Sequence, residues 1–127
     1  MSTTPSAHTD FRIDEEHPRP GSAVLALHGD ADLHAADELR ARLGAAIEAG
    51  AELLVVDLSE VTFVDSMTLG ALLEAAKRLR ARGHELRIAA PRPEVRRIFE
   101  LTLLDRVFPL DATRSEALAA PAEDARA

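Results

Sequence analysis

Apolar residues occur along the chain in two patterns, short runs of strand length and longer stretches with helical spacing. Strands are predicted at 11–14, where Phe11 and Ile13 share one face, and at 23–29, 53–58 and 85–91, where the apolar runs are nearly continuous. The run at 23–29 is typical of a strand that is buried on both faces. A short last strand is predicted within 105–110, and the two prolines and the glycine of 15–22 predict a turn.

Helical spacing predicts helices over 35–49, from about Ser66 to Gly83, over 93–101 and, more briefly, over 114–120. Gly50 and Gly83 stand where a glycine ends a helix. The alternation of strands and helices predicts an α/β fold with a mixed, mostly parallel sheet of four to five strands packed against helices. The first strand is expected to be antiparallel. We expect one domain over 10–120, a disordered tail over 1–9 and a flexible tail over 121–127.

Composition narrows the classes of function. The chain has 127 residues, of which 46% are apolar and none is cysteine, which excludes a disulfide scaffold and a thiolate nucleophile. A net charge of −7 disfavours nucleic acid as a partner. We see neither a secretory signal nor an apolar run of membrane-spanning length, and therefore expect a cytoplasmic protein with no membrane partner.

Several aspartates follow the predicted strands. Asp30 and Asp32 come after the second strand, Asp57 ends the third, and Asp65 precedes a helix. The carboxyl ends of parallel strands share one edge, so these groups could hold Mg²⁺ there. Aspartate more often serves as a turn or cap residue, and we favour that interpretation. His28 and His34 give only a weak indication of a metal site, and no metal is predicted.

Known catalytic arrangements are missing from the sequence. A phosphorylated receiver domain needs a lysine after a late strand, but Lys77, within a predicted helix, is the only lysine. There is no glycine-rich phosphate loop and no Gly-x-Ser-x-Gly turn. We therefore predict no enzymatic activity and no cofactor. A small enzyme or nucleotide-binding protein that uses the acidic edge ranks third among our hypotheses.

Ser66 lies at the start of a predicted helix, where its hydroxyl has two possible roles. Its oxygen, or that of Asp65, could cap the helix by accepting a hydrogen bond from an amide of the first turn. Ser66 could also accept a phosphate, because free amides and the helix dipole favour an anion at that end. The two roles are compatible. The added charge would fall on an acidic edge, and we expect it to repel a partner docked there.

Three segments carry a family resemblance: "HGDADLHAADELRARL", "LLVVDLSEVTFVDSMTLGALLEAAKRLRARGHELRIAAP" and "VRRIFELTLLDRVFPL". Over about residues 11–110 the chain resembles the STAS domains of bacterial anti-sigma factor antagonists. The resemblance implies a protein that is not an enzyme. It binds an anti-sigma factor that is also a serine kinase, and so frees a sigma factor. Phosphorylation of one serine breaks the complex, and a PP2C-type phosphatase restores it.

The resemblance implies Ser66 as the phosphoacceptor. It also implies a partner-binding set that consists of Gly29, Asp30, Asp32, Asp65, Ser66, Met67, Thr68 and Leu69. The alternative is a STAS scaffold or accessory subunit that binds one protein constitutively, in a signalling complex or a transporter.

The chain departs from the family pattern at three positions. Met67 and Thr68 stand where the family has a small residue and a glycine, which bears on whether a kinase can approach Ser66. Leu103 replaces a second family glycine, and we expect a different cap geometry at the end of the preceding helix.

Overall fold

The computed structural model describes residues 11–29, 33–90 and 92–119, which form a five-stranded sheet with helices on both faces. The elements are β1 (Arg12–Arg19), β2 (Ser22–His28), α1 (Leu33–Glu48), β3 (Leu53–Glu60), α2 (Ser66–Ala81), β4 (Glu85–Ala89), α3 (Pro93–Leu101), the 3₁₀ helix η1 (Leu104–Arg106), β5 (Leu110–Asp111) and α4 (Arg114–Ala119).

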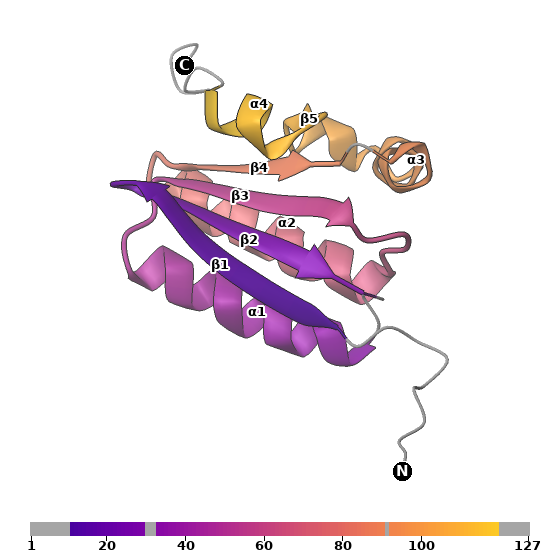
Figure 1. Cartoon of the computed structure of the whole chain (residues 1–127), viewed down its shortest axis with the longest axis horizontal. Coiled ribbons are helices and arrows are strands. Elements are labelled where there is room, and N and C mark those ends of the chain that lie inside the picture. Colours follow the sequence, from indigo (N-terminus) through magenta and orange to yellow (C-terminus); the bar gives the residue numbers. More distant parts are fainter. Residues whose placement is uncertain (1–10, 30–32, 91, 120–127) are drawn as a thin grey trace.

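The strands lie in the order β1-β2-β3-β4-β5, which is also their order in the chain. β1 runs antiparallel to β2, and every later pair of neighbours is parallel. Figure 1 shows α1 and α2 on one face of this sheet and α4 on the other. The prediction of a mixed, mostly parallel α/β sheet with an antiparallel first strand is therefore confirmed.

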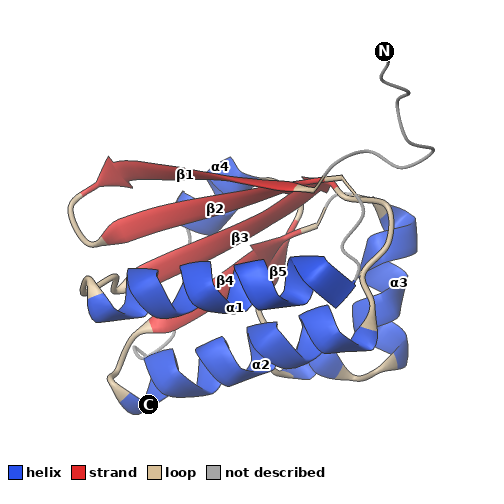
Figure 2. Ribbon diagram, turned by 90° about the horizontal axis from the view of Figure 1, so that it is seen from below, coloured by secondary structure: helices blue, strands red, loops and turns tan. Residues whose placement is uncertain are grey.

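The main hydrophobic core lies between the sheet and the helices α1, α2 and α3. Figure 2 shows α1 and α2 along the lower side of the strands and α3 at their right-hand end. Leu25, Leu54 and Leu72 are fully buried there. Phe99 of α3 meets Phe108 edge to face, with ring centroids 5.8 Å apart. Aliphatic side chains supply most of this burial because the chain has only four phenylalanines, no tyrosine and no tryptophan.

A smaller cluster covers the opposite face of the sheet. Val24, Val55 and Ala89 pack there against Ala117 of α4. Two contacts of basic side chains hold this short helix in place: Arg19 donates to the Leu118 carbonyl, and Arg114 reaches β3. α4 is thus an integral part of the fold.

β1 is longer than predicted. The turn expected over 15–22 is confined to Pro20 and Gly21, and the strand continues to Arg19. The pairing with β2 shifts register between Glu16 and Arg19, where Pro18 lies. Proline is compatible with an edge strand at such an irregularity because no ladder N–H is required of it.

The end of α3 contradicts the expectation of a different cap. Leu103 adopts φ 63° and ψ 15°, the left-handed conformation that suits glycine, and its amide donates to Glu100 O at 3.1 Å. Leu103 therefore adopts the backbone conformation that favours glycine, and the cap geometry at the end of α3 is not a different one. A left-handed conformation costs a residue with a Cβ about 1–2 kcal/mol.

Leu103→Gly is therefore expected to raise the free energy of unfolding by about 0.5–1 kcal/mol, after allowance for the greater freedom of glycine in the unfolded chain. Leu101→Gly is the matched control. That residue is also an exposed leucine, but it lies within α3, so the same change should destabilise by about 1 kcal/mol. Urea denaturation measures both, and a loss of stability in both variants would contradict the strain at Leu103.

Candidate functional site

The site lies where β3 ends and α2 begins. α2 starts at Ser66, as the sequence predicts, and Asp65 is its N-cap. The Asp65 carboxylate accepts a hydrogen bond from the Thr68 amide at 2.9 Å. The capping oxygen is therefore that of Asp65, which leaves the Ser66 hydroxyl available for another role.

Ser66 is exposed on the first turn of α2. Within the part of the chain that the structure describes, its hydroxyl has no hydrogen-bond partner, and neither do the backbone amides of Ser66 and Met67. Free amides and the positive end of the helix dipole favour an anion at this position. The geometry is thus compatible with a phosphate on Ser66.

Apolar contacts on either side fix the direction of this turn. Val64 precedes the N-cap and Leu69 follows it in the first turn, and both are buried in the main core. Such a pair holds the chain as it enters the helix. Phe63 and Met67 do not join the core: their side chains are 56% and 44% exposed. The sequence analysis named Met67 as a partner-binding residue and did not single out Phe63.

Thr68 and Leu69 are both buried, although the sequence-based set assigned them to a partner. Leu69 contributes to the main core, and Thr68 is 0% exposed. Neither side chain is accessible in this structure, so the exposed part of the predicted partner-binding set is smaller than the set that the family resemblance implies. Because the Thr68 side chain is buried, it does not obstruct a kinase that approaches Ser66.

The hydroxyl of Thr68 is buried without a hydrogen-bond partner. Leaving a buried hydroxyl unpaired costs about 1–3 kcal/mol, so Thr68→Val, which replaces the hydroxyl by a methyl of similar size, should stabilise the domain by about 1 kcal/mol. Thr68→Ser is the control, because it keeps the hydroxyl and loses the methyl group. Thermal and urea unfolding compare the three proteins, and a less stable valine variant would show that the hydroxyl is satisfied in solution.

Asp57 is buried and fully engaged within the fold. One carboxylate oxygen accepts from the amide and the hydroxyl of Ser59, and the other accepts from Arg114 Nε at 2.9 Å. Arg114 also lies 2.8 Å from Glu16 of β1, and the hydrogen bond to Glu16 raises the pKa of the guanidinium above its ordinary value. The Asp57 charge therefore belongs to a structural network that ties α4 to the sheet.

Of the four aspartates predicted at the acidic edge, the structure describes Asp57 and Asp65. Asp30 and Asp32 lie outside the described residues. Gly29, with φ 92°, ends β2 next to the pairing of His28 with Glu60, which places it beside the β3–α2 loop. Among the described residues, the unpaired acids of this loop are Glu60 and the capping Asp65, and Arg92 lies close by, donating to Ser59 O at 2.9 Å.

The described residues contain no cluster of three potential metal ligands. His28 lies 3.1 Å from the Asp14 carboxylate, across β1 and β2. The hydrogen bond from Arg12 is the main cause of the lowered pKa of Asp14; partial desolvation opposes it, and the Arg12 charge and the contact with His28 reinforce it. His28 is therefore engaged in a contact between β1 and β2.

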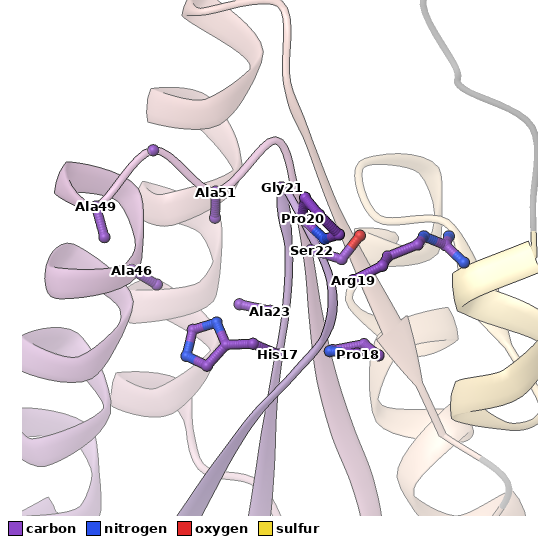
Figure 3. Close-up of a pocket in the computed structure, with 11 residues that line it drawn as sticks. His17, Pro18, Arg19, Pro20, Gly21, Ser22, Ala23, Ala46, Ala49 and Ala51 are labelled. Atoms are coloured by element: carbon purple, nitrogen blue, oxygen red, sulfur yellow. The ribbon is translucent and has the colours of Figure 1, made fainter.

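A cavity of about 440 Å³ lies at the other end of the sheet, between the β1–β2 turn and the end of α1. Figure 3 shows His17 and Ala23 pointing toward α1; Ala46 of α1 and Ala49, just after its end, form the opposite wall. None of the residues assigned a role by the sequence lines it. The cavity is therefore separate from the Ser66 site.

Residues 13–117 match the model of the STAS domain family. The chain belongs to this family. The Anti-sigma F factor antagonist of Paenibacillus polymyxa is 29% identical over 102 residues, which cover 80% of this chain and 86% of that protein.

Solved structures agree with this assignment. A crystal structure of an anti-sigma factor antagonist from Mycobacterium paratuberculosis is 31% identical, with a TM-score of 0.79 over 86% of this chain and 92% of that one. The unphosphorylated anti-sigma factor antagonist SpoIIAA gives a TM-score of 0.74 at 29% identity, over 84% of this chain and 93% of that one. SpoIIAA has also been solved in a phosphorylated form, which gives a TM-score of 0.68 at 28% identity over 84% and 96%.

Within the described residues, no helix combines the length and the apolar character needed to cross a membrane.

Proposed function

We propose that this chain is an anti-sigma factor antagonist that is switched by phosphorylation of Ser66. In its unphosphorylated form it binds an anti-sigma factor with serine-kinase activity, and so releases a sigma factor in the cytoplasm. The observation that carries the proposal is the exposed Ser66 hydroxyl on an N-terminal turn already capped by Asp65, in a chain of the STAS family. The names of the relatives above support the choice of partner.

The switch requires two reactions that other proteins catalyse. The kinase transfers the γ-phosphoryl group of ATP to Ser66 Oγ, the hydroxyl proton leaves to a base of the kinase, and ADP departs. A PP2C-type phosphatase then uses water to cleave the phosphoester bond, which regenerates the hydroxyl and yields inorganic phosphate. The chain itself supplies the acceptor and the surface that reports its state.

The proposed interface consists of exposed or partly exposed residues around α2: Gly29, Asp65, Ser66 and Met67. Asp30 and Asp32 remain assigned to it from the sequence alone. Thr68 and Leu69 support it from the core.

Intact-mass measurement tests the switch. The chain is incubated with ATP and each anti-sigma factor kinase encoded beside its gene. We expect the mass to rise by one phosphate in the wild type and not in Ser66→Ala. Ser59→Ala, which removes the serine nearest to Ser66 in the sequence, should still be phosphorylated. Binding without phosphate incorporation would favour the constitutive STAS scaffold instead.

A further inference from the structure

Two large apolar side chains flank Ser66. The described residues have four exposed large hydrophobic side chains, and two of them, Phe63 and Met67, lie within this short segment. The other two, Leu101 and Leu103, lie at the end of α3. That region is alongside the far half of α2, because Arg80 donates to the Val107 carbonyl at 3.1 Å.

The burial of Val64 and Leu69 keeps Phe63 and Met67 directed away from the core. Phe63 precedes Ser66 by three residues, so their Cα atoms are at most about 11 Å apart. A typical interface buries about 800 Å² on each partner, and a protein that covers Ser66 at this scale also covers both apolar side chains. Aromatic and methionine side chains are common anchors of such interfaces.

The charges that the structure describes near Ser66 provide little repulsion of their own. Asp57 is neutralised by Arg114, and Arg92 brings a positive charge to the end of β3, where it donates to Ser59 O. The described part of this edge is only weakly acidic. A partner complementary to a weakly acidic edge is neutral or basic there, and a phosphate would increase its attraction rather than reduce it.

We propose that Phe63 and Met67 insert into an apolar recess of the anti-sigma factor, and that phosphorylation of Ser66 breaks the complex by stranding a dehydrated phosphate between them. This inference rests on the proposed function. Anchors of this kind exclude water from their surroundings, and an anion that loses its water without gaining partners carries a large energetic penalty. The two apolar side chains thus convert a modification that the helix end tolerates into loss of binding.

The test separates charge from bulk. Ser66→Asp and Ser66→Asn differ in charge but hardly in size, so the ratio of their dissociation constants measures the charge penalty. Binding to the anti-sigma factor kinase is measured by calorimetry without ATP, at 50 mM and 500 mM salt. We expect a penalty of about 100-fold at both concentrations, because salt screens interactions between exposed charges and has little effect on buried ones.

Phe63→Ala should open the site to water and reduce the charge penalty to less than about tenfold. Leu101→Ala, which trims an exposed leucine on α3, is the control and should leave the penalty unchanged. If Phe63→Ala binds too weakly to measure, Met67→Ala provides the same comparison. Phe63 is exposed, so the melting temperature should stay near that of the wild type.

A penalty that shrinks severalfold at high salt and persists in Phe63→Ala and Met67→Ala would overturn the inference and leave the proposed function standing. Failure of the wild type to bind any anti-sigma factor kinase encoded beside its gene would instead overturn the proposed function itself.

Discussion

Replacing Ser66 with aspartate is expected to leave the fold intact while it weakens binding of the anti-sigma factor by about 100-fold. The fold should hold because Ser66 is exposed on the first turn of α2, where the amides of Ser66 and Met67 are free. A negative charge at this position interacts favourably with the helix dipole, worth about 0.3–1 kcal/mol. The melting temperature should therefore be unchanged or slightly higher.

Asp65→Ala provides the opposite pattern and serves as a control. It removes the cap that accepts from the Thr68 amide, so it should destabilise the domain by about 1 kcal/mol. Circular dichroism and calorimetric binding distinguish the two variants. Unfolding of Ser66→Asp would show that Ser66 has a structural role, and wild-type affinity in that variant would contradict the switch.

Arg114→Ala is expected to lower the free energy of unfolding by about 2–3 kcal/mol. Arg114 is the only basic side chain within the described residues that reaches Asp57, whose carboxylate is buried and is otherwise bonded only to Ser59. Its removal leaves that charge without its counter-charge and loosens α4 from Val24 and Val55. For a domain of this size the loss corresponds to a drop of about 10 °C in melting temperature.

Arg97→Ala is the matched control, since Arg97 is an exposed arginine of α3 with no charged or hydrogen-bonded partner among the described residues. It should change stability by less than about 0.5 kcal/mol. Asp57→Asn in the Arg114→Ala background should recover part of the loss, because it removes the stranded charge. A loss below about 0.5 kcal/mol for Arg114→Ala alone would show that the Asp57 contact contributes little in solution.

The architecture follows from features that a sequence displays directly. The apolar run of 53–58 and the helical spacing after Ser66 locate β3 and α2, and the intervening helix makes β3 parallel to β2. A side-chain cap from Asp65 or Ser66 follows from the chemistry of short polar side chains, and the structure assigns it to Asp65. These features are local, so the sequence of a single strand or helix is enough to predict each of them.

Other features depend on residues that are distant in sequence. Asp57 looked like one of several acids at the sheet edge, but Arg114, from a helix on the opposite face, neutralises it. Nothing in the spacing of the two residues indicates that contact. The buried Thr68 and the left-handed Leu103 are similar cases, since the surrounding packing imposes on each a state that its residue type does not favour.

Phe63 is a residue of the site whose exposure the sequence pattern did not indicate. In "VTFVDS" the alternation would place Val61 and Phe63 on one face of a strand, and Val61 is indeed buried. The chain leaves the sheet after Glu60, and the contact of Val64 with the core leaves Phe63 outside. A pattern of apolar residues alone does not reveal this change of direction.

Release of a sigma factor is the most direct measurement of the proposed switch. The chain is added to a preformed complex of the anti-sigma factor with its sigma factor, and free sigma factor is measured by size-exclusion chromatography. We expect that the unphosphorylated chain and Ser66→Ala both release the sigma factor, and that the chain phosphorylated on Ser66 does not. Equal release by the phosphorylated and unphosphorylated chains, or no release by either, would contradict it.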